Sequence, residues 1–179
     1  MNRIVVLGVS AGAGKSSFAR KLSEKTTIPV YHLDAYFWKP GWVENSEEEF
    51  SAQQRKLVEK EHWIIEGNYS STYNIREQRA DTIIYLELPL IICLYRVVKR
   101  RIIYHGKTRP DLGEGCPEKL DKAFLKFIVS TYFERKIKMR KRIEQFKEGN
   151  PHNQVVLLRN QKEIDQFFNE VIVKNDLHS

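Results

Sequence analysis

The sequence predicts a three-layer α/β/α protein in which a five-stranded parallel sheet lies between helices. Short apolar segments alternate with longer amphipathic segments along the chain, which is typical of a parallel sheet with right-handed helical crossovers. The first apolar segment leads directly into a glycine-rich loop and a helix. The length of 179 residues suits a single domain, residues 1–179, with a full hydrophobic core.

The glycine-rich loop predicts a nucleotide site. It follows a strand expected at residues 4–7 and precedes a helix expected at about residues 15–25, and it contains Gly14-Lys15-Ser16. Backbone N–H groups in such a loop point inward and meet the positive end of the helix, so the loop suits a polyphosphate. Lys15 is expected to reach the β- and γ-phosphates, and Ser16 to ligate Mg²⁺. The predicted nucleotide-binding residues of the loop are Ala11, Gly12, Ala13, Gly14, Lys15, Ser16 and Ser17.

The loop departs from the standard pattern at its first glycine. In G-x-x-x-x-G-K-[ST] that glycine stands five residues before Gly14, a position occupied here by Val9. Gly8 lies one residue earlier. The loop is therefore expected either to be one residue longer or to turn without that glycine.

Two acidic residues are expected at the carboxyl ends of strands. A second strand at residues 29–33 ends at Asp34, and a third at residues 62–65 is followed by Glu66. The carboxyl ends of parallel strands meet at one edge of the sheet, where ligands bind in open α/β folds. Asp34 and Glu66 are therefore expected to lie beside Gly8.

The segment between these two strands is predicted to be an aromatic loop and a helix. Residues 35–45 are rich in aromatic side chains, and their turn is expected at residues 39–41. Ser46 begins a helix that reaches about residue 60, with Glu49 in the capping-box position.

The rest of the chain adds two strands and three helices. In order, we expect a polar segment at residues 68–79, a strand at 81–86, a helix at 90–104, a loop at 105–117, a long helix at 120–147, a strand at 154–158 and a helix at 162–173. The helix at 90–104 carries apolar residues close to the spacing of one face: Ile91, Leu94, Val98 and Ile102. The loop at 105–117 contains three glycines and two prolines and is expected to be mobile.

The charge distribution suits an anionic partner. The net charge is +7, and basic residues concentrate at residues 96–109 and 135–147. Phosphorylated small molecules and nucleic acid would both suit this charge. No helix-turn-helix, zinc-finger or RNA-binding motif is visible in the sequence.

The composition indicates a cytoplasmic protein. Cys93 and Cys116 fit neither a zinc pattern nor a secreted scaffold and are expected to stay reduced. The N-terminal segment has the pattern of a core strand rather than of a signal sequence. No apolar run approaches the ~20 residues of a membrane span, so no membrane partner is expected. The sequence does not indicate the oligomeric state.

The chain resembles the adenylate kinase-related phosphate-loop proteins, and within them the bacterial DNA topology modulation proteins. The stretches that carry this resemblance are GVSAGAGKSS, VYHLDAYFWKPGW, WIIEGNYS, ADTIIYLELP, YRVVKRR and GKTRPDLGEGCPEKLD. The resemblance implies a phosphate-loop NTPase fold like that of nucleotide kinases, with ATP and Mg²⁺ as cofactors. It also implies an acceptor-side insert at about residues 35–60 and a mobile lid at about residues 105–117.

The resemblance assigns roles to several charged residues. Glu66 matches the acid that holds Mg²⁺ through water, although a solvent-facing acid is the alternative. Arg96 and Arg100 resemble the lid pair, which implies that Arg96 stacks on adenine and Arg100 reaches the phosphates; a solvated basic helix face is the alternative. Arg109 resembles an arginine finger, unless it is an ordinary surface residue. The stretch MRKRI, with Arg140 and Arg142, resembles the second basic arm of the lid; basic residues that face water are the alternative.

The sequence departs from nucleotide kinases on the acceptor side. Those kinases hold a monophosphate acceptor with arginines, one of them four residues after the third-strand acid. That position is Ser70 here, and residues 35–54 contain no arginine and a single lysine, Lys39. An AMP-like acceptor bound in the usual way is therefore not expected.

Asp34 is the predicted acceptor-side residue. A carboxylate after the second strand can accept the proton of a substrate hydroxyl or hold it in line, as phosphoryl transfer to an alcohol requires. Nearby aromatic residues would wall the pocket or pack beneath a loop: Tyr36, Phe37, Trp38 and Trp42. His32 is expected to be a core histidine rather than a base.

The sequence therefore predicts a phosphotransferase that moves the γ-phosphoryl group of Mg-ATP to a nucleoside, a nucleotide or a hydroxylated metabolite. The predicted catalytic residues are Lys15, Asp34, Arg100 and Arg109, and the predicted Mg²⁺ ligands are Ser16 and Glu66. The alternatives are an ATP-dependent nucleic-acid-binding protein that affects DNA topology, and a regulator that hydrolyses ATP slowly. The acceptor itself is not identified by the sequence.

Overall fold

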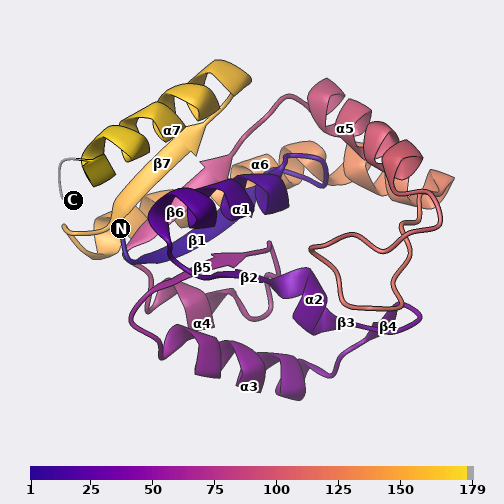
Figure 1. Cartoon of the computed structure of the whole chain (residues 1–179), viewed down its shortest axis with the longest axis horizontal. Helices are drawn as coiled ribbons and strands as arrows, with labels where there is room; N and C mark the ends of the chain where they lie inside the picture. Colours follow the sequence, from indigo (N-terminus) through magenta and orange to yellow (C-terminus); the bar gives the residue numbers. More distant parts are fainter. Residues whose placement is uncertain (177–179) are drawn as a thin grey trace.

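Five parallel strands form the central sheet of the computed structural model, which describes residues 1–176, with side chains through residue 171. The strand order is β2-β5-β1-β6-β7 (Figure 1). The strands are β1 Arg3–Gly8, β2 Val30–His32, β5 Trp63–Glu66, β6 Thr82–Leu86 and β7 Gln154–Leu158. The predicted fold class, an α/β protein with a five-stranded parallel sheet, is confirmed.

Helices cover both faces of this sheet. They are α1 Lys15–Thr26, α2 Leu33–Phe37, α3 Glu47–Val58, α4 Tyr73–Glu77, α5 Leu90–Ile103, α6 Lys122–Gly149 and α7 Gln161–Asp176. The chain moves toward one edge of the sheet from β1 to β2 and then travels back through β5, β6 and β7. Right-handed crossovers therefore place α1 on one face, and α3, α4 and α6 on the other. The α7 helix packs beside α1, where Phe18 contacts Phe167 and Phe168.

The segment after β2 is more regular than the sequence predicted. The strand ends at His32, and Asp34 lies in the first turn of α2 rather than directly at a strand end. Burial of Leu33 anchors this turn, and an acidic residue is favourable near a helix N-terminus. Residues expected to form a loop instead form the hairpin of β3 Trp38–Lys39 and β4 Val43–Glu44.

The predicted start of α3 is confirmed in part. The Ser46 hydroxyl accepts a hydrogen bond from the backbone N–H of Glu49 at 3.2 Å. The Glu49 carboxylate does not complete the expected box, because it accepts a hydrogen bond from Lys39 Nζ at 2.8 Å. This contact ties the start of α3 to the hairpin.

The predicted apolar face of α5 is wrong. Cys93 and Val97 are buried, whereas Ile91 and Ile102 are 71% and 72% exposed. The helix carries apolar residues around most of its circumference. The spacing of apolar residues therefore predicts an apolar face but does not show which side of the helix packs on the core.

Residues 105–121 join α5 to α6 and lie on the same side of the molecule as the β3–β4 hairpin (Figure 1). Isolated bridges connect His105 with Glu118 and Thr108 with Pro117. Asp121 begins α6, since its carboxylate accepts the Phe124 N–H at 2.7 Å. None of the helices in the described part of the chain is both long and apolar enough to cross a membrane.

Candidate active site

The phosphate loop joins β1 to α1 and packs directly on α5. Gly12 and Gly14 have φ angles of 79° and 89°, which favour glycine. A Cβ atom at Gly12 would overlap the backbone carbonyl of Cys93. Only glycine at this position therefore lets α5 approach the loop so closely.

Gly8 is needed because the Lys15 side chain folds back over it. A Cβ atom at Gly8 would lie 2.7 Å from Cγ of Lys15. The Asn68 side chain accepts the Gly8 N–H at 3.0 Å and donates to the Gly8 carbonyl at 2.6 Å. Positive φ angles at non-glycine residues in the described chain occur at Thr27 and Trp42, so Val9 has an ordinary backbone conformation. Position 9 therefore needs no glycine, whereas Gly8 leaves no room for a side chain, and both expected alternatives stay predictions.

Glu66 is a buried carboxylate at the centre of the site. It is 3% exposed, so the solvent-facing alternative is wrong. Ser16 Oγ donates to Glu66 Oε2 at 3.1 Å, and Lys15 Nζ lies 3.8 Å from Oε1. His32, expected in the core, is mostly buried and places Nδ1 3.0 Å from Oε2. The Ser16 hydroxyl and the Glu66 carboxylate are hard oxygen donors, which fits Mg²⁺ held directly and through water.

Asp34 lies across the site from the phosphate loop and is bound by a tyrosine. Its Oδ1 atom accepts the Tyr69 hydroxyl at 2.7 Å, while Oδ2 lies 4.0 Å from Arg109 Nη2. Burial raises the pKa of Asp34, and the charge of Glu66 raises it further. The Tyr69 hydrogen bond and the charges of Lys15 and Arg109 oppose this increase. Burial and Asp34 raise the pKa of Tyr69, which keeps its hydroxyl a donor.

Arg76 supports the segment that carries Tyr69. It is fully buried in α4 and donates to Gln54 Oε1 at 2.6 Å. It also donates to the carbonyls of Gly67 at 3.3 Å and Tyr69 at 3.2 Å. Burial lowers the pKa of Arg76 to about 10. Arg76 therefore holds the backbone between Glu66 and Tyr69.

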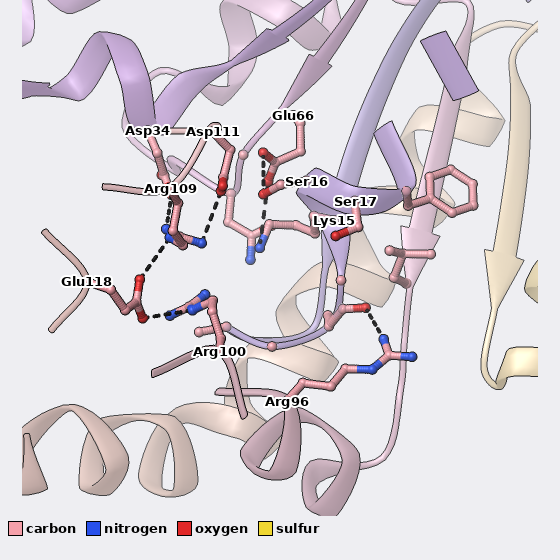
Figure 2. Close-up of a pocket in the computed structure, with 18 of the residues that line it drawn as sticks. Lys15, Ser16, Ser17, Asp34, Glu66, Arg96, Arg100, Arg109, Asp111 and Glu118 are labelled. Carbon is pink, nitrogen blue, oxygen red and sulfur yellow. Dashed lines mark hydrogen bonds and ion pairs between the residues drawn. The ribbon is translucent and has the colours of Figure 1, made fainter. Parts of the chain in front are cut away.

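The segment at residues 105–121 is fastened to the site by Glu118. Figure 2 shows Glu118 between Arg100 and Arg109. Both guanidinium Nε atoms lie 2.8 Å from its carboxylate, and Arg109 Nη1 lies 3.0 Å from Asp111. The Arg109 side chain is only 10% exposed, so the surface alternative is wrong. Burial, reinforced by the charge of Arg109, lowers the pKa of Arg100.

Cys116 fixes the same segment to the β3–β4 hairpin. Its side chain is buried, and Sγ donates to the carbonyl of Lys39 at 3.3 Å. The Trp42 indole donates to the carbonyl of Pro117 at 3.0 Å. The segment expected as the lid is therefore closed against the β3–β4 hairpin.

The basic residues of α5 and α6 differ in their partners. Arg96 donates to the carbonyl of Ala13 at 3.2 Å and to Gln161 at 3.1 Å, so it lies against the phosphate loop. Its predicted stacking on adenine stays a prediction. Arg140 forms two hydrogen bonds with Glu87, at 2.7 and 2.6 Å. It is therefore occupied outside the cavity, whereas Arg142 of the same helix lines it.

One cavity of about 1260 Å³ brings these groups together (Figure 2). Every predicted site residue lines it: Ala11, Gly12, Ala13, Gly14, Lys15, Ser16, Ser17, Asp34, Glu66, Arg96, Arg100 and Arg109. Trp38 and Trp42 form part of its wall, as expected. Phe37 instead packs against Phe50 and Tyr69. The sequence did not predict Tyr69, Asp111 or Glu118 as lining residues, whereas Arg142 belongs to the stretch that resembles the second basic arm of the lid.

Comparisons with known proteins identify the fold. No protein-family model matches the sequence, and no curated protein matches it in sequence. The chain is similar to the shikimate kinase from Acinetobacter baumannii in complex with shikimate, at 14% identity and a TM-score of 0.53, over 99% of this chain and 96% of that chain. It is similar to a gluconokinase from Sinorhizobium meliloti 1021, at 15% identity and a TM-score of 0.53, over 96% and 90%. It is also similar to the shikimate kinase from Bacteroides thetaiotaomicron, at 16% identity and a TM-score of 0.53, over 99% of both chains.

These likenesses establish a class of fold. The chain has the α/β fold of phosphate-loop kinases. The narrower resemblance to DNA topology modulation proteins stays a prediction.

Proposed function

We propose that the protein transfers the γ-phosphoryl group of Mg-ATP to a hydroxyl group of a small-molecule acceptor. The observation that carries this proposal is that Asp34 and the phosphate-loop lysine, Lys15, line the same cavity. A donor held by the loop and an alcohol held by the carboxylate would therefore meet in one enclosed space. In-line transfer requires such positioning more than it requires covalent chemistry by the protein.

The donor side would be formed by the phosphate loop and α5. Backbone N–H groups of the loop and the Lys15 ammonium would bind the phosphates, with Arg100 close to them. Ser16 would hold Mg²⁺ directly, and Glu66 through water. When bound, the ion would neutralise charge on the β- and γ-phosphates.

The acceptor side would depend on Asp34. The acceptor hydroxyl gives its proton to Oδ2, because Oδ1 already binds the Tyr69 hydroxyl. Its oxygen attacks the γ-phosphorus as the bond to the β–γ bridging oxygen breaks, and ADP leaves with those electrons. The raised pKa of Asp34 makes the carboxylate a better proton acceptor than an ordinary aspartate. Arg109, 4.0 Å from Asp34, would face charge on the transferred group.

The similar structures support this class of reaction at the level of the fold. Two of them are shikimate kinases and one is a gluconokinase, and one shikimate kinase was solved in complex with shikimate. A shared fold alone does not determine a function, so the proposal depends on the placement of Asp34 in this chain.

No contact favours the nucleic-acid alternative. On α6, Lys136 and Arg140 pair with Glu87. Three other basic residues of this helix line the cavity: Arg135, Lys138 and Arg142. These five basic residues therefore serve the cavity or an internal carboxylate, although Lys138 and Arg140 also expose much of their side chains.

The test is a measurement of ATP consumption across a panel of nucleosides, nucleotides, sugars and hydroxy acids. We expect one compound class to stimulate it and Lys15→Ala to abolish the stimulated rate. Asp34→Asn should lower that rate by about 10²–10⁴-fold and leave nucleotide binding intact. Lys39→Ala is the control, because Lys39 pairs with Glu49 at the surface.

Two outcomes would contradict the proposal. Unchanged turnover in Lys15→Ala would exclude the phosphate loop as the donor site. ATP hydrolysis that responds to duplex DNA and to none of the small molecules would favour the nucleic-acid alternative. A slow rate that no compound changes would favour the regulator.

A further inference from the structure

The arginines that line the cavity differ in whether the protein neutralises them. Arg100 and Arg109 are paired with Glu118 and Asp111. Arg142 forms no direct ion pair within 4.0 Å among the described residues, although its charge interacts with that of Glu77. A partly buried guanidinium without a carboxylate retains its capacity for charge-assisted hydrogen bonds.

Two contacts hold Arg142 in place. Its Nη1 donates to Ser70 Oγ at 3.2 Å, and its guanidinium lies 4.7 Å from the centre of the Tyr73 ring. The hydrogen bond to Ser70 occupies one of five N–H groups. Stacking on Tyr73 orients the guanidinium plane without neutralising it. Arg142 is therefore a positioned guanidinium without a direct ion pair at the wall of the cavity.

Two consecutive residues contact Asp34 and Arg142. The Tyr69 hydroxyl binds Asp34 at 2.7 Å, and Ser70 binds Arg142 at 3.2 Å. Asp34, Tyr69, Ser70 and Arg142 line the same cavity. An acceptor in this part of the cavity can therefore contact both charged groups.

Ser70 also stands where nucleotide kinases would have an arginine. The structure brings a guanidinium to this position from a distant part of the chain, because α6 carries Arg142 across to the segment after β5. Arg135, on the same helix, lines the same cavity and adds positive potential. The acceptor side is consequently basic although residues 35–54 contain no arginine.

We propose that the acceptor carries an anionic group, a carboxylate or a phosphate, which Arg142 and Ser70 bind while Asp34 holds the hydroxyl to be phosphorylated. This inference rests on the proposed function. It restricts the acceptor to hydroxy acids or phosphorylated alcohols. Arg142 acts on binding of the acceptor and not on the transferred phosphoryl group.

The experiment compares acceptors that differ only in charge. A stimulating hydroxy acid is paired with its amide, and a phosphorylated alcohol with its unphosphorylated form, so the two arms separate carboxylate from phosphate. Each pair is measured with the wild type, Arg142→Gln, Arg142→Lys and Lys141→Gln. Lys141 is the matched control, since it is an exposed neighbour outside the cavity lining.

We expect Arg142→Gln to raise KM for the anionic acceptor by roughly 10–100-fold, the loss of a hydrogen bond between charged groups, with a smaller change in kcat. KM of Arg142→Lys for the anionic acceptor should lie between those of the wild type and Arg142→Gln, because lysine keeps the positive charge but loses the planar guanidinium group. KM for the neutral analogues should not change, and Lys141→Gln should behave as the wild type. Circular dichroism and the melting temperature verify folding of each variant.

Failure of this inference can be distinguished from failure of the proposed function. Equal turnover of neutral and anionic acceptors, with KM unchanged in Arg142→Gln, overturns the anion site and leaves the kinase proposal standing. Stimulation by none of the compounds contradicts the kinase proposal. In that case the anion site is tested by calorimetry, which measures the binding of inorganic phosphate in the presence of a saturating non-hydrolysable ATP analogue. Binding lost in Arg142→Gln supports it, and binding that is absent or unchanged overturns it.

Discussion

Asp34 is held in an environment that favours its neutral form, and this determines how the proposed activity should respond to pH. Its pKa is raised from 3.8 by burial and by Glu66, and it is lowered in part by the Tyr69 hydrogen bond. The proposed base must be ionised. We therefore expect kcat to fall toward low pH with a midpoint above that of an ordinary aspartate, and Tyr69→Phe to move the midpoint to still higher pH.

The pH dependence of kcat, measured in the wild type and in Tyr69→Phe, tests this expectation. Tyr31→Phe is the matched control, because the Tyr31 hydroxyl contacts Lys60 and does not line the cavity. A midpoint that Tyr69→Phe leaves unchanged would mean that Asp34 does not govern the acidic limb.

The same raised pKa predicts that Asp34 lowers the stability of the folded protein. A carboxyl group whose pKa is higher in the folded than in the unfolded state binds its proton more tightly when folded. Stability therefore falls as pH rises from the unfolded value through the folded value, and the ionised group remains unfavourable above this range. Asp34→Asn should consequently raise the melting temperature at pH 7, and less so at pH 3. A decrease at pH 7 would contradict the direction of the shift.

Individual site residues were predictable where a local pattern determines them. Lys15 and Ser16 follow from the loop, and Glu66 follows from its place at a strand end. Arg76 and Glu118 were not predictable, because their partners are distant in sequence. Arg76 binds Gln54, 22 residues away. Glu118 binds Arg100, 18 residues away. A charged residue in a polar segment gives no sign of burial until the fold brings such partners together.

At the scale of elements, one carboxylate fastens residues 105–121. Glu118 is buried between Arg100 and Arg109. Glu118→Gln would leave two guanidinium groups facing each other without a negative charge. Breaking a buried ion pair costs about 3–5 kcal/mol, and the cost should appear as local opening of this segment. We expect faster hydrogen exchange and proteolysis at residues 105–121, with the sheet unchanged.

Glu114→Gln is the control for this experiment. Glu114 lies in the same segment and is exposed. Equal exchange rates in the two variants would show that Glu118 does not hold the segment. Opening of the sheet together with the segment would show that Glu118 stabilises the whole fold.

Element type was predicted better than element orientation. Strands, long helices and the Ser46 cap were predictable, because short-range patterns control them. The buried side of α5 was not, since Ile91 and Ile102 repeat as regularly as the buried Cys93 and Val97. The side is chosen by the phosphate loop, which needs Cys93 close to Gly12.

At the scale of the whole molecule, the cavity joins the sheet edge to α5, α6 and residues 105–121. A ligand bound there contacts all of these parts and should stabilise the folded state by mass action. Mg-ATP at 100 times its Kd adds about 2.7 kcal/mol. At about 2–4 °C per kcal/mol for a chain of this size, the melting temperature should rise by roughly 5–11 °C.

Thermal unfolding with and without Mg-ATP measures this shift. Lys15→Ala should show little of it, and Lys39→Ala should show all of it. An equal shift in Lys15→Ala would mean that the nucleotide binds outside the phosphate loop.

The parallel sheet was predictable from the alternation of apolar and amphipathic segments, because parallel strands need crossovers on their faces. The closure of the cavity was not. It depends on contacts between Trp42 and Pro117 and between Cys116 and Lys39, which join segments about 75 residues apart. No local pattern encodes such pairs.

The reactivity of the buried Cys116 thiol can report how often residues 105–121 open. A disulfide reagent can reach this sulfur only after the segment leaves the Lys39 carbonyl. Cys93 should not react, because it lies on the buried side of α5 and burial raises its pKa to about 11. The rate at which the reagent modifies Cys116 in the native protein therefore measures how often this segment opens. We expect Glu118→Gln to increase this rate, Mg-ATP to reduce it and Cys116→Ser to abolish the signal; a rate that none of these changes would mean that Cys116 reacts without opening.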